Sequence, residues 1–183
     1  GEVKGDLGDL KIEVIVDKKN KKIHLTDKGI GMTHEEVQKY INEVAFSGAE
    51  EFLEQYKDSA KDSGIIGHFG LGFYSAFMVA EKVEIITKSF KDEAAAHWIC
   101  DGSPEYSLKK SQKEERGTEI ILHISKDSKD YLEESKITEL LNKYNKFMPF
   151  PIKFGTKEET INKDEKGEKS ETKTVDNIIN NTN

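Results

Sequence analysis

The stretch IGHFGLGFYSAF, residues 66–77, places three glycines directly before an apolar pattern with helical spacing. Glycine inside a helix costs about 1 kcal/mol relative to alanine, so Gly67, Gly70 and Gly72 need a physical reason. Glycines at the start of a helix let a ligand or a second backbone come close, and the N–H groups exposed there favour phosphate. The stretch therefore predicts a phosphate-binding loop at the entrance of a helix over residues 73–79.

A second glycine motif, DKGIG at residues 27–31, precedes the first by 40 positions. Neither motif is specific alone: the first GxxGxG is neither the dinucleotide fingerprint nor a P-loop, and DxGxG also occurs where a hairpin runs into a helix. With RGTEIILHI at 116–124 they together indicate a purine-nucleotide site. Asp27 at a strand end can accept a hydrogen bond from an exocyclic amine, and the Thr118 hydroxyl can complete that site directly or through water. Gly31 lets the backbone approach a flat purine ring.

Periodicity predicts the surrounding elements. Alternating apolar residues predict strands at 10–16, 23–25, 82–89, 95–100, 105–109, 118–124 and 152–154. A capping box at Thr33 and Glu36 predicts a helix over 34–45 with Val37, Tyr40, Ile41 and Val44 on its core face, and a further helix is expected around Ile137–Tyr144. Clustered strands with helices between them favour an α+β two-layer sandwich over a doubly wound sheet.

The polarity of the chain changes near its C-terminal end. Residues 1–155 are interpreted as one domain. Residues 156–174 are nearly all charged or polar and cannot bury enough apolar surface to offset the entropy of ordering, which predicts a charged linker or an exposed hairpin. Residues 175–183 are expected to begin the connection to a middle domain.

Composition narrows the class of protein. The 28 Lys and Arg against 35 Asp and Glu give a net charge of −7, which argues against binding nucleic acid or an anionic membrane. Cys100 is the single cysteine, so no internal disulfide can form. The five histidines show no metal-ligand spacing with Cys100, and we predict no metal site. A cytoplasmic protein with no membrane partner is expected.

The ordered set DKGIGMT, FSGAEEF, IGHFGLGFYSAFMVAEKV and RGTEIILHI resembles the ATP-binding domain of the heat-shock protein 90 chaperones, especially the bacterial high-temperature protein G branch. The resemblance runs from Leu10 to Phe154. The wider GHKL (Bergerat) superfamily of type II topoisomerases, mismatch-repair ATPases and histidine kinases shares the two glycine motifs but not GFYSAF or the RGT strand. The resemblance implies a two-layer α/β sandwich whose mixed, largely antiparallel sheet is covered by helices and holds the nucleotide.

The resemblance also implies a role for each matching residue. Asp27 would bind the adenine amino group, Gly31 and Met32 would line the base pocket, and Thr118 would support Asp27 through water. Residues 46–66 would form a lid that closes over ATP. The phosphate contacts would come from Gly67, Phe69, Gly70, Leu71, Gly72 and Phe73.

Three departures from the family pattern stand out. Phe46 occupies a position that is basic in many relatives, and Tyr40 occupies a polar position that often touches the nucleotide. The family also has a long first helix, with a Glu that activates the attacking water and an Asn that holds Mg²⁺. The sequence does not contain that helix, so we expect no catalytic residue here and no hydrolysis by the chain alone.

The expected function is that of the ATP-binding domain of an ATP-dependent, heat-shock-type chaperone that assists the folding of client proteins. In the parent protein the resemblance implies ATP or ADP with Mg²⁺, a homodimer, and unfolded or partly folded clients. Two alternatives stay open: another GHKL ATPase domain of the mismatch-repair or topoisomerase type, and a non-catalytic nucleotide-binding module.

Overall fold

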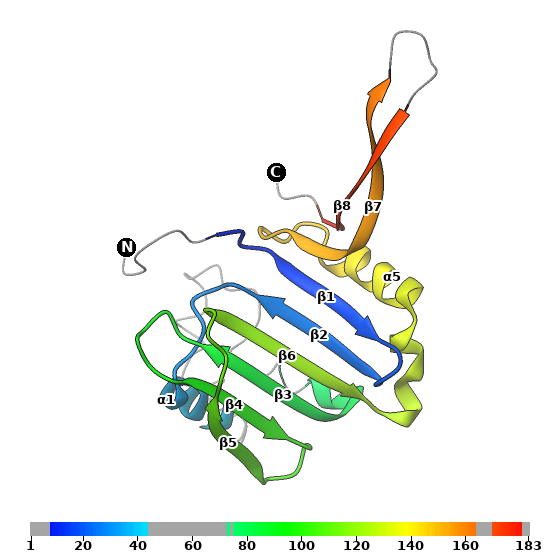
Figure 1. Cartoon of the computed structure of the whole chain (residues 1–183). Coiled ribbons are helices and arrows are strands. Elements are labelled where there is room, and N and C mark those ends of the chain that lie inside the picture. The colour runs from blue at the N-terminus through cyan, green and yellow to red at the C-terminus, as the bar shows by residue number, and fades with distance from the viewer. Residues whose placement is uncertain (1–7, 44–72, 74, 164–169, 181–183) are drawn as a thin grey trace.

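The structure is a computed structural model that describes residues 8–43, 73, 75–163 and 170–180. Its centre is an eight-stranded sheet in the order β5-β4-β3-β6-β2-β1-β7-β8, which Figure 1 shows nearly face on. The strands are β1 (Ile12–Asp17), β2 (Lys22–Asp27), β3 (Ala80–Lys88), β4 (Ala95–Cys100), β5 (Tyr106–Ser111), β6 (Gly117–Ile124), β7 (Ile152–Lys163) and β8 (Ser170–Ile178). Strands β1 and β7 pair in parallel and the other neighbours are antiparallel. The predicted α+β class with a mixed, largely antiparallel sheet is confirmed.

Short helices accompany the sheet. They are α1 (His34–Val37), the π-helix η1 (Gln38–Glu43), the 3₁₀-helices η2 (Ser75–Met78) and η3 (Lys126–Leu132), and α5 (Glu134–Tyr144). In Figure 1, α1 lies beside β4 and α5 lies beside β1. None of the described helices is long and apolar enough to cross a membrane.

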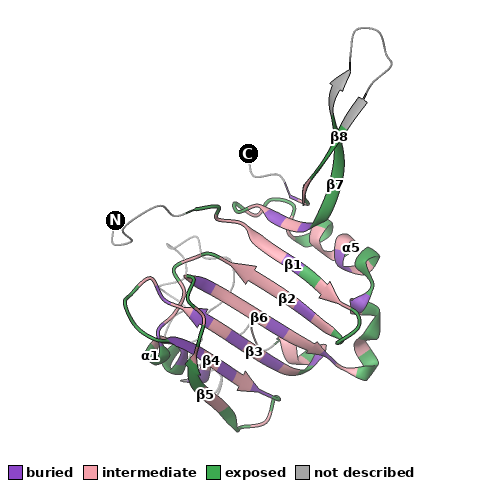
Figure 2. Cartoon of the chain, viewed as in Figure 1, coloured by how far each residue is buried: buried purple, intermediate pink, exposed green. Residues whose placement is uncertain are grey.

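One face of the sheet carries the core, and we call it the helix-covered face. Alternation along β3 puts Val83 and Ile85 on this face and Glu84 on the opposite face. Two apolar clusters form there, and Figure 2 shows buried positions concentrated in the central strands. The first gathers Val14, Ile23, Ile124, Leu132, Ile137, Ile152 and Phe154; the second gathers Val37, Ala80, Val83, Ile85, Ala96, Trp98 and Cys100.

The predicted helix over 34–45 begins as expected but does not continue as an α-helix. The capping box is present: the Thr33 hydroxyl accepts from the Glu36 amide, and the Glu36 carboxylate accepts from the Thr33 amide. From Gln38 the helix is a π-helix, whose i→i+5 hydrogen bonds widen each turn. The core side therefore recurs four and five residues after Val37, at Ile41 and Asn42. Tyr40, expected on the core face, is instead 52% exposed.

Two further expectations can be compared with the structure. Within the predicted helix over 73–79, Phe73 is helical and Ser75–Met78 form the 3₁₀-helix η2, whose turns are tighter than those of the expected α-helix. Within the segment expected to be a charged linker or an exposed hairpin, residues 156–163 and 170–174 lie in β7 and β8, an antiparallel pair that projects from the sheet in Figure 1, with Glu158, Glu159 and Thr160 exposed. A hairpin, rather than a linker, is what the structure has here.

Residues 175–180, expected to start a connection to a middle domain, contribute to this sheet. Val175–Ile178 are the last residues of β8. The buried Asn180 side chain accepts from the Ile152 amide at 2.7 Å and donates to the carbonyls of Met148 and Phe150. This side chain thus holds the loop before β7 against the end of β8.

Candidate functional site

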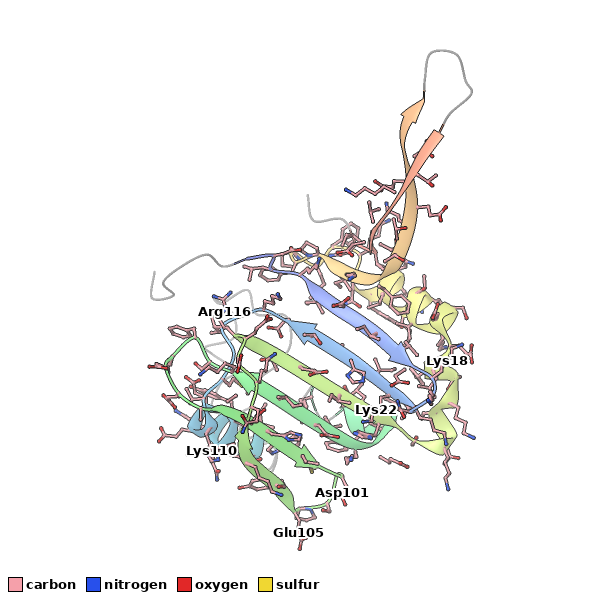
Figure 3. The ribbon with its side chains drawn as sticks, viewed as in Figure 1. Lys18, Lys22, Asp101, Glu105, Lys110 and Arg116 are labelled. Atoms are coloured by element: carbon pink, nitrogen blue, oxygen red, sulfur yellow. The ribbon has the colours of Figure 1, made fainter. Side chains whose placement is uncertain are left out.

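A polar row crosses three strands at one end of the helix-covered face. In the sheet register, Asp27 of β2 pairs with Thr118 of β6, and Thr118 pairs with Thr87 of β3. Alternation puts these three residues on the same face as the apolar residues two positions away on each strand, Leu25, Ile120 and Ile85. The structure therefore brings Asp27 and Thr118 together, as the sequence analysis expected. In Figure 3, Arg116 marks this end of the sheet, and Lys18 and Lys22 lie at the other end.

The Asp27 carboxylate is half-buried and held by its own loop. Its Oδ1 accepts a hydrogen bond from the Gly29 amide at 2.7 Å. Within the described residues, Oδ2 has no hydrogen-bond partner. On the other side, Gly117 sits with φ +121°, and a Cβ there would be 2.1 Å from the Asp27 carbonyl oxygen. The surrounding backbone is thus packed closely around an acid that keeps one acceptor oxygen available.

The loop after β2 is fastened to the end of β3 by three consecutive residues. The Ile30 carbonyl accepts from the Phe90 amide at 2.8 Å, and the Met32 amide donates to the Thr87 hydroxyl at 2.9 Å. Between them, Gly31 adopts φ +63°, and a Cβ on it would lie 1.9 Å from the Lys88 carbonyl oxygen. Close approach to β3 is therefore one reason for glycine at position 31, beside its expected role next to a purine ring.

Thr87 is a member of the row that the sequence analysis did not identify. Its side chain is fully buried, and its hydroxyl lies 2.9 Å from the Thr118 hydroxyl and 3.4 Å from the Gly117 carbonyl. The sequence contained one signal: Thr87 follows Val83 and Ile85 at alternate positions, so a hydroxyl occupies a core-facing place. A buried hydroxyl needs partners, and two of them here, the Thr118 hydroxyl and the Met32 amide, belong to residues predicted to lie at the base.

The remaining predicted site residues divide into two groups. Phe73 packs edge-on against Trp98, with ring centroids 5.4 Å apart, and against Phe77 at 6.3 Å. Phe73 and Met32 both border the second apolar cluster. The positions outside the described residues are the rest of the phosphate loop, Gly67, Phe69, Gly70, Leu71 and Gly72, together with the lid over 46–66 and Phe46 within it.

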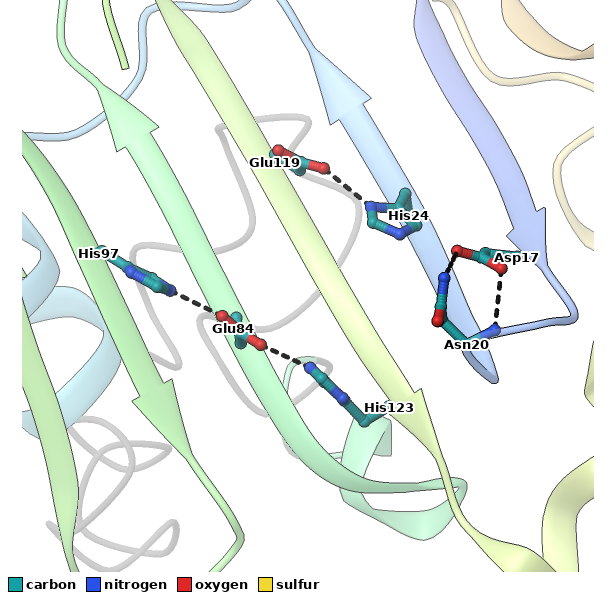
Figure 4. Close-up of polar contacts among 7 residues, drawn as sticks. All are labelled: Asp17, Asn20, His24, Glu84, His97, Glu119 and His123. Carbon is teal, nitrogen blue, oxygen red and sulfur yellow. Dashed lines mark hydrogen bonds and ion pairs between the residues drawn. The ribbon is translucent and has the colours of Figure 1, made fainter. Parts of the chain in front are cut away.

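A second titratable cluster lies on the opposite face of the sheet, shown in Figure 4. The Glu84 carboxylate bridges His97 at 2.8 Å and His123 at 2.6 Å, and His24 contacts Glu119 at 2.8 Å. Burial alone would raise the pKa of Glu84, but the hydrogen bonds from His123 and His97 lower that pKa to about 2. Burial lowers the pKa of His123. This cluster is separated from Asp27 by the sheet itself, so it lies apart from the predicted nucleotide site.

Metal-ligand clusters and cavities, over the part of the chain that the structure describes, bear on the chemistry that the row can perform. Among the residues that the structure describes, no three His, Cys, Asp or Glu side chains gather as a metal centre would require. A cavity of about 570 Å³ lies between β1, β7 and α5, and none of its lining residues is a predicted site residue. The chemistry available at the row is hydrogen bonding: an acid acceptor beside two linked hydroxyls.

Comparisons with known proteins show the family of the chain. A model of the histidine kinase-, DNA gyrase B- and HSP90-like ATPases matches residues 3–133. The chain is 58% identical over 183 residues to chaperone protein HtpG of Bacteroides thetaiotaomicron, covering 100% of this chain and 26% of that protein. It is 56% identical over 160 residues to chaperone protein HtpG of Porphyromonas gingivalis, covering 87% of this chain and 23% of that protein.

A more distant relative is the endoplasmin homolog of Dictyostelium discoideum, 40% identical over 158 residues, which are 85% of this chain and 20% of that protein. The chain spans about a quarter of the length of the HtpG relatives it matches. The predicted resemblance to the HSP90 chaperones and their bacterial branch is confirmed. By the family model that covers most of its length, the chain belongs to the histidine kinase-, DNA gyrase B- and HSP90-like ATPases.

Proposed function

We propose that this chain is the nucleotide-binding domain of an ATP-dependent chaperone and that adenine binds at Asp27. The observation that carries the proposal is the state of the Asp27 carboxylate. One oxygen is held by the Gly29 amide at 2.7 Å, and the other is without a partner in the described residues. An exocyclic amine supplies the donor that this second oxygen lacks. The same carboxylate rejects a base that presents a carbonyl at that position, because two acceptors would face each other.

The neighbouring groups fit the rest of a purine. Thr118 stands opposite Asp27 in the register and offers a hydroxyl to a ring nitrogen, directly or through a bridging water. Met32 and the Gly31 backbone would lie along the base. For the phosphates we retain Gly67, Phe69, Gly70, Leu71, Gly72 and Phe73, supported by the spacing of the glycines before a helix.

The activity of the longer protein is also a proposal. We propose that the longer protein forms a homodimer and hydrolyses ATP with Mg²⁺. In it, residues 46–66 would act as a lid that closes over ATP. The protein would assist the folding of client proteins in the cytoplasm after heat shock. The names of the HtpG relatives and the ATPase family support this assignment. We assign no residue of this chain to Mg²⁺ or to the hydrolytic step.

Calorimetric titration with ADP, with and without Mg²⁺, tests the adenine site. Asp27→Asn keeps an oxygen for the Gly29 amide but removes the charge and an acceptor. We expect ADP binding to weaken about 10- to 100-fold, the range of a charged hydrogen bond. The matched control is Glu119→Gln, on a neighbouring strand and the opposite face, which should bind as the wild type does. Equal ADP affinity in Asp27→Asn and the wild type would place the adenine elsewhere.

A further inference from the structure

We propose that Thr87 is a positioning residue for base recognition, and that its buried hydroxyl sets which way the Thr118 hydroxyl donates. Thr87 does not face the ligand in this proposal; it acts through Thr118 and Met32. The inference rests on the proposed adenine site at Asp27. It assigns the selectivity for adenine to a three-residue row instead of to the acid alone.

The hydrogen-bond inventory of Thr87 carries the argument. A threonine hydroxyl has one proton to donate and two lone pairs to accept with. The Met32 amide, 2.9 Å away, uses one lone pair. The proton can go to Thr118 Oγ1 at 2.9 Å or to the Gly117 carbonyl at 3.4 Å. The shorter distance favours donation to Thr118, since a 3.4 Å contact is long for a hydroxyl donor.

Donation from Thr87 has a direct consequence for Thr118. When Thr118 Oγ1 accepts a hydrogen bond from Thr87, the Thr118 hydroxyl can donate its own proton toward the side on which Asp27 lies. Adenine presents a donor, its amine, beside an acceptor, its ring nitrogen. Asp27 accepts from the amine, and Thr118 donates toward the ring nitrogen directly or through water. Hypoxanthine presents the inverse pattern, an acceptor oxygen beside a ring N–H, and fits this arrangement poorly.

Burial makes the arrangement persistent. Thr87 is 0% exposed, so water cannot replace its partners. The Met32 amide occupies one of the two Thr87 lone pairs, and the Gly117 carbonyl at 3.4 Å is a poor alternative acceptor for the Thr87 proton, which biases Thr87 toward donating to Thr118. The loop around Gly31 is fixed to β3 by the Phe90 amide and by the close contact with the Lys88 carbonyl. The position of the Met32 amide is therefore set by the fold and not by the ligand.

The test compares ADP with inosine diphosphate in the full-length protein that contains this chain. Thr87→Val keeps the shape and removes the hydroxyl, and Thr87→Ser restores it. The control is Thr26→Val, the same replacement in β2, the strand of Asp27, on the opposite face of the sheet. We expect the ratio of the two dissociation constants, inosine diphosphate over ADP, to fall about tenfold in Thr87→Val, the value of one hydrogen bond. Thr87→Ser and Thr26→Val should keep the wild-type ratio within about twofold, against that tenfold scale.

Each outcome decides the question. Equal weakening of both nucleotides with an unchanged ratio would make Thr87 a structural residue and overturn the proposal, as would unchanged ADP binding. Loss of Met32 amide protection from hydrogen exchange in Thr87→Val, without ligand, would confirm the contact itself. If Thr87→Val does not fold, Thr87→Cys replaces the hydroxyl by a weakly donating thiol, and a wild-type ratio there overturns the proposal. A wild type that binds no ADP would refute the adenine site, and this inference with it.

Discussion

Replacing Gly31 by alanine should destabilise the chain far more than the same replacement at Gly155. Both glycines adopt a left-handed backbone, with φ +63° at Gly31 and +73° at Gly155. They differ in their surroundings: a Cβ on Gly31 would be 1.9 Å from the Lys88 carbonyl oxygen, whereas a Cβ on Gly155 meets nothing within 4 Å. The pair therefore separates the cost of backbone conformation from the cost of close approach.

The magnitudes follow from this geometry. A non-glycine residue in the left-handed region costs about 1 kcal/mol, and Gly155→Ala should show little more than that. In Gly31→Ala the loop must also move away from β3, since Cβ contacts below 3.0 Å essentially do not occur. That movement breaks the Phe90–Ile30 and Met32–Thr87 hydrogen bonds, at about 1 kcal/mol each. The expected loss is about 3 kcal/mol for Gly31→Ala.

Urea denaturation and thermal melting measure both variants. For a chain of this length, 1 kcal/mol lowers the melting temperature by roughly 2–4 °C, so Gly31→Ala should melt about 6–12 °C below the wild type and Gly155→Ala about 2–4 °C below. ADP affinity should fall only in Gly31→Ala. Equal destabilisation of the two variants would show that the contact with β3 does not constrain the loop.

Two remaining predictions concern the opposite face and the second apolar cluster. Because hydrogen bonds hold the pKa of Glu84 at about 2, below its ordinary 4.5, this carboxylate stabilises the fold above pH 4.5 and stops doing so as the pH falls toward 2. In Glu84→Gln, the free energy of unfolding measured by urea denaturation should fall less between pH 4.5 and pH 2, by up to about 3 kcal/mol. An equal fall in the variant and the wild type would refute the pairing of Glu84 with the histidines. Asn42→Ala should lower the free energy of unfolding by about 1–3 kcal/mol and change the fluorescence of the single tryptophan, because the buried Trp98 indole N–H loses its hydrogen-bond partner at 2.5 Å. An unchanged spectrum and an unchanged free energy of unfolding would contradict this.

The strands could be predicted from the sequence because each buries one face. The predicted bounds of β4, 95–100, agree with the structure, and those of β3 and β6 lie within a few residues of it. Alternation gives these bounds because successive side chains point to opposite faces of a strand. The order of the strands was not predicted, because alternation says which residues share a face and not which strands are neighbours. Within the site, Asp27 and Thr118 could be predicted as strand-end polar residues. Thr87 could not, because its role exists only once β3 pairs with β6.

The π-helix shows a different limit of sequence reasoning. Val37, Tyr40, Ile41 and Val44 fit a 3.6-residue repeat, which predicted a regular helix over 34–45. A tertiary contact competes with this pattern: the Trp98 indole N–H donates a hydrogen bond to the side-chain oxygen Oδ1 of the buried Asn42. A wider turn brings Asn42 to the core side and turns Tyr40 outward. The sequence around Asn42 does not predict the π-helix, because the hydrogen-bond partner of Asn42 lies 56 positions away in the chain.

The position of the polar row explains why one sheet can carry both a core and a recognition site. On the helix-covered face, an apolar row lies next to the polar row. It consists of Leu25, Ile120 and Ile85, each two residues along its strand from Asp27, Thr118 and Thr87. Packing of the apolar row fixes the spacing of the three strands. The polar row beside it is therefore held at the same spacing. A buried hydroxyl such as Thr87 would destabilise an isolated strand, but here its partners are supplied by β6 and by the glycine loop. The proposed base recognition would therefore depend on register, and a change that shifts β3 against β6 should abolish base selectivity before it abolishes folding.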